Sequence, residues 1–278
     1  MLVNFTKMLK DAQAGGYAVG LFNTIDLDCA QAVLEAAEEL RSPVIIGTAE
    51  VLRPYGELDM LAPSLKAMAE KVSVPVALNY DHGLTFQGCM DALKLGFTSI
   101  MFDGSLGTFQ ENMELTAEMV RIAHAMGASV EGEIGHVGDV IKGEGNDADA
   151  YTTPEQAMEY IEKTGVDALA VAIGTAHGTY VTKPKLDVER LKQIRAAVDT
   201  PLVLHGGSGL TDEDFRNTIA GGITKINIYT DVVAAGKESL QKAFAEGLCL
   251  ADARTVKVAG IKEAVKAKMT LFGSVGKA

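Results

Sequence analysis

The feature that most constrains this chain is an alternation, repeated eight times, between a short apolar run and a longer segment with helical spacing. The runs are apolar on both faces, as in VALN, ALAVAI and PLVL, which is typical of strands buried on both sides of a parallel sheet. Between them, residues such as Leu34, Ala37 and Leu40 recur on one helical face. The predicted strands span residues 18–22, 44–47, 76–79, 99–102, 129–133, 168–173, 202–204 and 225–228.

Eight strand–helix units predict the α/β class and a (β/α)8 TIM barrel, a fold that takes about 250 residues. The chain has 278 residues and no linker rich in Pro or Ser, so we expect a single barrel domain over residues 1–278. Residues 255–269 follow the eighth unit and predict an extra C-terminal helix. A doubly wound open sheet is the alternative fold.

The charge balance excludes one class of partner. Asp plus Glu total 37 against 25 Lys plus Arg, which gives a net charge of −12, and no basic run occurs. Such a chain repels a phosphate backbone, so we expect no nucleic-acid partner. A phosphorylated small molecule would have to be held by local donors.

Cysteine usage and hydropathy indicate a soluble, cytoplasmic protein. The three cysteines are too scattered for a disulfide framework, and no stretch of 18 apolar residues occurs. The first residues, MLVNFTKMLKDAQAGG, lack the apolar region of a signal peptide. We therefore expect free thiols in a reducing compartment and no membrane partner.

Polar residues gather where the predicted strands end. In a barrel these positions converge on one face, whatever their separation in sequence. Three imidazoles on three strand ends can surround one divalent ion, and neutral imidazole suits Zn²⁺. We therefore predict that His82, His177 and His205 bind zinc. The other polar residues at these ends are Asn23, Asp81, Asp103, Glu131, Glu133, Asn227 and Thr230.

Two neighbouring segments predict a phosphate site. HGGSG follows the seventh strand, and its glycines let backbone N–H groups approach an anion closely. NIYTD follows the eighth strand and opens a helix, whose N-terminus favours negative charge. The loops after strands 7 and 8 are the usual phosphate site of this fold.

A metal ion beside a phosphate site and carboxylates indicates chemistry on a phosphorylated carbonyl compound. A Lewis acid can polarise a ketone and stabilise the enediolate formed when an adjacent bond breaks, while a carboxylate moves protons. Asp81 precedes a predicted metal ligand and can reach a hydroxyl on the next carbon. An imine mechanism needs a Lys at the carboxyl end of a strand, and Lys225 lies at the other end of its predicted strand.

These residues resemble those of the class II, zinc-dependent ketose-bisphosphate aldolases, of the fructose- and tagatose-bisphosphate kind. The resemblance covers essentially the whole chain, and its segments occur in the family's order. They are GLFNTIDLDCAQAVLEAAEELRSPVIIG, NYDHG, SIMFDGS, VEGEIG, AIGTAHGTY, LHGGSGL, KINIYTD and LFGSVGKA.

The resemblance implies a lyase that reversibly cleaves fructose 1,6-bisphosphate or tagatose 1,6-bisphosphate into dihydroxyacetone phosphate and glyceraldehyde 3-phosphate. Asp81 would be the catalytic acid/base at the C4 oxygen, and Asn23 would contact the substrate. Asp103 and Glu133 resemble a second metal position, and a monovalent cation is implied beside Gly178 and Ser208. The residues implied to bind the triose-phosphate half are Gly178, Gly206, Gly207, Ser208, Asn227, Ile228, Tyr229 and Thr230.

Two parts of the chain depart from the family pattern. The segment GHVGDVIKGEGNDADAY lacks the Gly-Gly of the family's mobile loop, and Glu144 is the nearest equivalent of its proton-abstracting Glu, with Asp139, Asp147 and Asp149 as competitors. Arg254 is the best match for the residue that meets the distal phosphate, often from a neighbouring subunit of a homodimer or homotetramer.

Several alternatives stay open from the sequence. The stereochemistry at C4 and the substituent at C6 are not fixed by any motif, so an aldolase of the same mechanism on another ketose 1-phosphate is one alternative. A non-catalytic subunit of an aldolase complex and a zinc-dependent epimerase or isomerase are the others. The non-catalytic subunit would be expected to have lost metal ligands that are present here.

Overall fold

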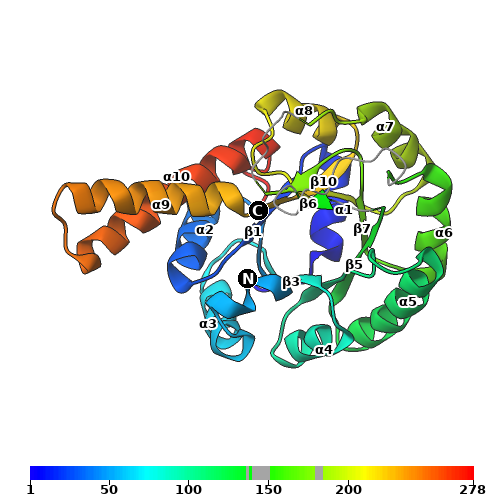
Figure 1. The fold of residues 1–278 in the computed structure, drawn as a ribbon, viewed down its shortest axis with the longest axis horizontal. Coiled ribbons are helices and arrows are strands. Elements are labelled where there is room, and N and C mark those ends of the chain that lie inside the picture. Colours follow the sequence, from blue (N-terminus) through cyan, green and yellow to red (C-terminus); the bar gives the residue numbers. More distant parts are fainter. Residues whose placement is uncertain (136–137, 140–150, 179–183) are drawn as a thin grey trace.

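The computed structural model describes residues 1–135, 138–139, 151–178 and 184–278. Eight parallel strands close into a barrel in the order β1-β10-β9-β7-β5-β4-β3-β2, and helices surround it (Figure 1). The predicted TIM barrel is therefore confirmed, and the open sheet is wrong. The barrel strands are β1 (Val19–Asn23), β2 (Val44–Ala49), β3 (Val76–Gly83), β4 (Ser99–Phe102), β5 (Ser129–Ile134), β7 (Ala168–Val171), β9 (Leu202–Leu204) and β10 (Ile223–Ile228). A two-residue pair, β6 (Gly138–Asp139) and β8 (Ala176–His177), lies outside this sheet.

Most strand boundaries agree with the apolar runs within two residues, because burial on both faces selects the same residues. The exception is β3, which continues to Gly83 and so takes Asp81 and His82 into the strand itself. β10 begins at Ile223, two residues before the predicted start, and Lys225 is therefore an interior residue of a fully buried strand.

Local capping chemistry explains where the helices begin. At the start of α6, the Thr153 hydroxyl accepts from the Gln156 N–H and the Gln156 side chain accepts from the Thr153 N–H, which satisfies two donors that the helix leaves free. The helices are α1 (Phe5–Gly15), α2 (Leu27–Leu40), α3 (Leu58–Lys71), α4 (Phe86–Lys94), α5 (Phe109–Ala125), α6 (Pro154–Thr164), α7 (Val188–Ala197), α8 (Asp212–Ala220), α9 (Thr230–Ala245) and α10 (Leu250–Phe272), with a 3-10 helix η1 (Glu50–Tyr55) after β2.

The last two helices form an arm that projects from the barrel (Figure 1). α9 and α10 lie against each other, and α10 also packs on α2. The extra C-terminal helix predicted over residues 255–269 is thus present and longer, because its apolar face runs from Ala253 to Phe272. No helix in the described part of the chain combines the length and apolarity needed to cross a bilayer.

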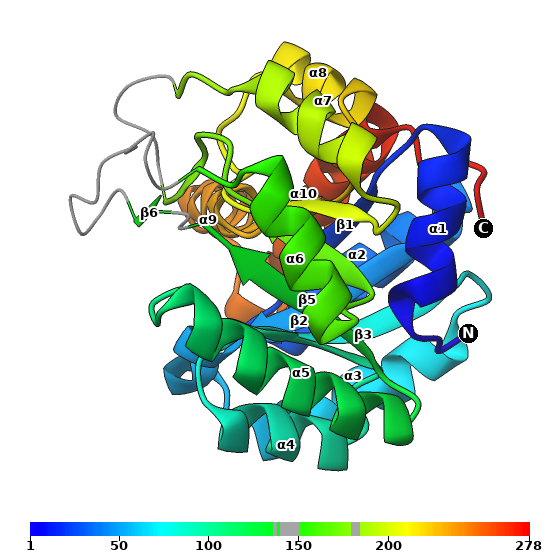
Figure 2. The same ribbon diagram turned by 90° about the vertical axis from the view of Figure 1, so that its right-hand side faces the viewer.

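One end of the barrel is closed by apolar side chains. α1, which the sequence pattern did not predict, buries Phe5 and Leu9 against the barrel interior residues Val19, Ile45 and Val203. Figure 2 shows α1 and both termini at this end, with β6 and α9 at the other. The polar strand ends therefore lie on the face opposite to α1, where the fold leaves room for a site.

Candidate active site

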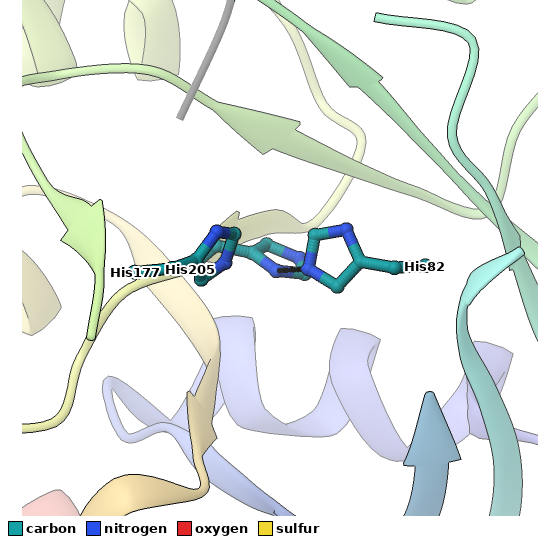
Figure 3. A group of neighbouring side chains, drawn as sticks. All are labelled: His82, His177 and His205. Carbon is teal, nitrogen blue, oxygen red and sulfur yellow. Dashed lines mark hydrogen bonds between the residues drawn. The ribbon is translucent and has the colours of Figure 1, made fainter. Parts of the chain in front are cut away.

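Three imidazoles converge at the carboxyl ends of the strands. His82 comes from β3, His177 from β8 and His205 from the end of β9, and Figure 3 shows their rings turned toward one another. Ring centroids lie 4.6 Å apart for His82 and His205 and 4.8 Å apart for His82 and His177. One ligand nitrogen of each residue lies within 4.8 Å of the others. Nitrogens that share a tetrahedral zinc ion lie about 3.4 Å apart, so small adjustments suffice.

The hydrogen bonds around these rings fit a metal ion. His82 Nδ1 lies 2.9 Å from Asp103 Oδ2, and His205 Nε2 lies 2.7 Å from Glu131 Oε1. Because carboxylates accept hydrogen bonds, the outer nitrogens of the neutral rings carry the protons. The inner nitrogens, His82 Nε2 and His205 Nδ1, then face each other at 2.9 Å with a lone pair each. Such a pair needs a cation or a proton, and outer nitrogens bonded to carboxylates are usual for histidines that bind metals.

The electrostatics of the cluster also favour a cation. Burial and the charge of His82 lower the pKa of His177 to about 3, and the same two causes hold the pKa of His205 well below its ordinary value, so both rings are neutral. Burial also disfavours charge on His82, but the Asp81, Asp103 and Glu133 carboxylates outweigh it and raise its pKa to about 10. The field that stabilises a proton there would stabilise a divalent ion at the same place.

An irregularity in β3 lets two adjacent residues face the site. Neighbouring residues of a regular strand point to opposite faces. Here the register between β3 and β4 shifts between Tyr80 and Gly83, and His82 has a φ of 42° in the left-handed region. The shift turns His82 to the side on which Asp81 lies. The left-handed backbone of His82 costs of order 1–3 kcal/mol, and strain of this kind is retained mainly at functional sites.

Asp81 is held by two amides. Asn23 Nδ2 donates to Asp81 Oδ2 at 2.7 Å, and Asn227 Nδ2 donates to both carboxylate oxygens at 2.9 and 3.1 Å. Burial alone would raise the pKa of Asp81, but the charges of His82 and Lys225 lower it below its ordinary value. Asp81 is therefore an ionised and oriented proton acceptor.

The histidines and Asp81 open onto a pocket of about 350 Å³. Among the described residues that line it, the ionisable side chains are the three histidines, the acidic Asp81, Asp103 and Glu133, and Tyr229, with no Lys or Arg. A phosphorylated ligand would meet excess negative charge in such a pocket unless a cation balanced it. The predicted site residues that line it are Asn23, Asp81, His82, Asp103, Glu133, His177, Gly178, His205, Gly206, Gly207, Ser208, Asn227, Tyr229 and Thr230.

The two predicted phosphate segments meet at one edge of the pocket. Ser208 Oγ accepts from the N–H groups of Tyr229 (3.3 Å) and Asp231 (3.4 Å), at the start of α9, whose N-cap residue Tyr229 makes no cap bond with its own side chain. Gly206 has a φ of 64°, and a Cβ there would lie 2.4 Å from the carbonyl oxygen of Ala176. A glycine at this position thus lets the loop after β9 pack against the segment that carries His177.

Asp103 and Glu133 form a second cluster with His82. One ligand atom of each lies within 4.8 Å of the others, so the two carboxylates stand where a second metal position would share His82. Asp103 Oδ1 also accepts from the N–H and hydroxyl of Ser105. These contacts and the His82 hydrogen bond outweigh burial and hold the pKa of Asp103 well below its usual range.

Two predicted site residues lie elsewhere. The Ile228 side chain is buried in the apolar core and does not line the pocket. Arg254 lies on α10, where it pairs with Asp28 at 2.7 Å and donates to Gln31 at 2.9 Å. Glu144, with Asp147 and Asp149, lies outside the described residues, as does the side chain of Asp139.

Two residues that support the site, Lys225 and Glu131, were not assigned a role from the sequence. Lys225 Nζ lies 2.7 Å from Glu131 Oε2 and donates to Asn227 Oδ1 at 2.7 Å. The sequence placed Lys225 at the wrong end of its strand for an imine mechanism, and the structure shows that its long side chain nevertheless reaches Asn227 within the barrel interior. The available signal was a lysine inside the apolar run ITKINI.

Comparison with known proteins agrees with this geometry. A family model described as "Fructose-bisphosphate aldolase class-II" matches residues 3–277. The fructose-bisphosphate aldolase of Geobacillus stearothermophilus is 41% identical over 286 aligned residues, covering 100% of this chain and 99% of the relative. That of Thermus caldophilus is 40% identical over 100% of both chains. The crystal structure of the YdjI aldolase from Escherichia coli K12 superimposes with a TM-score of 0.92 at 36% identity, again over 100% of both chains.

The closed (β/α)8 barrel with converging histidines and an aspartate at its carboxyl face, together with the matched family and its named relatives, places the chain in the aldolase class of lyases. The chain belongs to the class II fructose-bisphosphate aldolase family.

Proposed function

We propose that this chain is a zinc-dependent aldolase that reversibly cleaves fructose 1,6-bisphosphate into dihydroxyacetone phosphate and glyceraldehyde 3-phosphate. The observation that carries the proposal is the cluster of His82, His177 and His205 beside an ionised Asp81. The relatives at about 40% identity over the whole chain are named for the same substrate. Tagatose 1,6-bisphosphate, which differs at C4, is the first alternative substrate.

His82, His177 and His205 would hold the zinc ion through His82 Nε2, His205 Nδ1 and one nitrogen of His177. When bound, zinc polarises the substrate carbonyl and stabilises the negative charge that develops on the triose-phosphate half. Asp103 and Glu133 would offer an alternative position for a divalent ion, and a monovalent cation near Gly178 and Ser208 belongs to the same proposal.

Asp81 would move the proton at C4. In the cleavage direction its carboxylate accepts the proton of the C4 hydroxyl, the C4 carbonyl forms, and the C3–C4 bonding electrons pass to the triose-phosphate half. Asn23 and Asn227 keep the carboxylate aimed at that hydroxyl. A second acid then delivers a proton to C3, and we assign this role to Glu144, so that both products leave neutral at carbon.

Backbone donors would bind the phosphate of the triose half. Gly206, Gly207 and Ser208 line the pocket beside the start of α9, a combination that favours an anion. Arg254 would meet the distal phosphate of a substrate bound to a neighbouring copy, and the assembly that we propose is a homodimer or homotetramer. We also propose that residues 1–278 act as one domain and that the enzyme works in the cytoplasm.

The test is metal removal followed by product analysis. A chelator should abolish production of triose phosphate from fructose 1,6-bisphosphate, and added zinc should restore it. Full activity without metal would contradict the zinc mechanism. An epimerase would return a six-carbon isomer and no triose phosphate. A panel of ketose phosphates that vary at C4 and C6, ranked by kcat/KM, identifies the substrate.

A further inference from the structure

An ion pair is sealed inside the barrel beneath the pocket. Lys225 and Glu131 are both 0% exposed, and neither lines the pocket. Two buried charges cost several kcal/mol each to desolvate, and apolar replacements of such pairs are often neutral or stabilising. Stability alone is therefore a poor reason for this pair, so its other contacts are informative.

Glu131 uses its second oxygen on a proposed zinc ligand. Glu131 Oε1 lies 2.7 Å from His205 Nε2, while Oε2 faces Lys225. Since the carboxylate accepts, Nε2 of His205 must carry the hydrogen, and Nδ1 keeps its lone pair. That Nδ1 lies 2.9 Å from His82 Nε2 and 3.3 Å from the Asn227 amide nitrogen, a donor that favours the same tautomer. Glu131 thus selects the tautomer of His205 that can bind a metal.

Lys225 makes its second contact with the amide that holds Asp81. Lys225 Nζ donates to Asn227 Oδ1 at 2.7 Å. An ammonium group has no acceptor, so the amide must turn its oxygen to Lys225. Its nitrogen then faces Asp81, where it donates at 2.9 and 3.1 Å to a carboxylate that can only accept. Lys225 thus fixes the direction of the Asn227 amide.

We propose that the Lys225–Glu131 pair positions both halves of the catalytic apparatus at once, the tautomer of His205 on one side and the Asn227–Asp81 contact on the other. Both are positioning residues, because they reach the reaction only through His205 and Asn227. The inference rests on the proposed function for its catalytic half, while its metal-binding half is measured without turnover.

The decisive variant removes both charges together, Lys225→Met with Glu131→Gln. Lys225→Met alone leaves a carboxylate buried without its cation and should unfold at a lower temperature, whereas the double variant relieves that cost. The double variant still loses the positioning, because the introduced glutamine can present either end of its amide to His205 and the introduced methionine donates nothing to Asn227. Zinc affinity, measured by competition with a chelating dye on the full chain, should fall about 10- to 100-fold.

Turnover separates positioning from support of the fold. With zinc saturating, kcat of the double variant on fructose 1,6-bisphosphate should fall about tenfold or more while KM stays close to that of the unmodified chain, because the pocket lining is intact. Lys225→Gln keeps a donor for Asn227 and should recover part of kcat. The control is the double variant Lys262→Met with Glu39→Gln. It removes an ion pair of 2.7 Å between α10 and α2 and should change neither kcat nor KM.

The proposal would be overturned if the double variant had a melting temperature close to that of the unmodified chain and kept its zinc affinity and kcat. The pair would then have a structural role only. If the double variant does not fold, Glu131→Gln carries the test, and unchanged zinc affinity in that variant has the same meaning. Failure of the unmodified, zinc-loaded chain to form triose phosphate would instead contradict the proposed function, and the dye competition would still decide the His205 half.

Discussion

The two ends of the barrel each carry an aspartate–histidine hydrogen bond of nearly equal length. At the carboxyl ends of the strands, Asp103 Oδ2 lies 2.9 Å from His82 Nδ1, and at the amino ends Asp167 Oδ2 lies 2.8 Å from His124 Nε2. Asp167 also accepts from the Thr6 hydroxyl and the Val130 N–H, so this pair ties α1 and α5 to the sheet. All three of these partners of Asp167 belong to the packed elements of the fold.

The pair at the carboxyl ends is incomplete in a specific way. His82 Nε2 faces a second imidazole nitrogen, and the rings of His177 and His205 stand beside it. An aspartate–histidine pair thus connects elements of the fold at one end of the barrel and forms part of the candidate binding site at the other. Position relative to strand direction, rather than residue type, decides which occurs. Variants at the two ends should accordingly separate activity from stability.

The largest effect is expected from Asp81→Ala. Loss of the group that moves the C4 proton should lower kcat by about 10²- to 10⁴-fold, the range typical of general acid–base groups. The variant should still bind zinc through the three histidines, with lower affinity because the Asp81 carboxylate contributes to the negative field at His82. Steady-state kinetics with saturating zinc check the loss. A decrease in kcat below about tenfold would assign the proton to another residue.

At the apolar end of the barrel, Leu9→Ala should lower stability and leave activity unchanged. Leu9 is fully buried in the cluster that α1 forms with the barrel interior. Its truncation should lower the free energy of unfolding by about 2–5 kcal/mol through lost burial and a residual cavity. Denaturant titration measures this cost, and kcat on folded protein should not change. A coupled loss of kcat would mean that the packing of α1 sets the geometry of the opposite face.

Asp103→Asn breaks the first of the two aspartate–histidine pairs. An amide has no charge and only one acceptor oxygen for both Ser105 and His82, so the proton on His82 Nδ1 is held less firmly and the metal-binding nitrogen is less well defined. Zinc affinity or activity should fall about 10- to 100-fold, as is usual when a carboxylate partner of a metal-binding histidine is lost. Dye competition and kinetics measure the two quantities. Unchanged values in both would show that His82 is oriented by the bend of β3 alone.

The sequence predicts the fold well because the signals for the barrel are local. Runs such as VALN and PLVL are apolar along their whole length, which both identifies them in the sequence and drives their burial in the barrel. α1 was missed because its role, closing the barrel end with Phe5 and Leu9, depends on residues far along the chain.

The site was predictable only in part. Strand direction brings His82, His177 and His205 to one face once the barrel is assumed. The left-handed φ of His82 and the register shift beside it carry no local signature, although they let Asp81 and His82 share that face. The contacts of Lys225 with Glu131 and Asn227 depend on side-chain reach across the barrel interior, which strand boundaries do not give.

The smallest effect is expected from Asp167→Asn, the counterpart of Asp103→Asn at the other end of the barrel. The amide oxygen can keep one of the contacts with Thr6, Val130 and His124, and the histidine of the pair is partly exposed, so the loss should be about 1 kcal/mol of unfolding free energy. Zinc affinity and kcat should be unchanged, because no atom of this pair lies at the carboxyl face. Equal changes in zinc affinity for the two Asn variants would refute the contrast between the two ends, since the shared factor would then be the residue pair and not its place in the barrel.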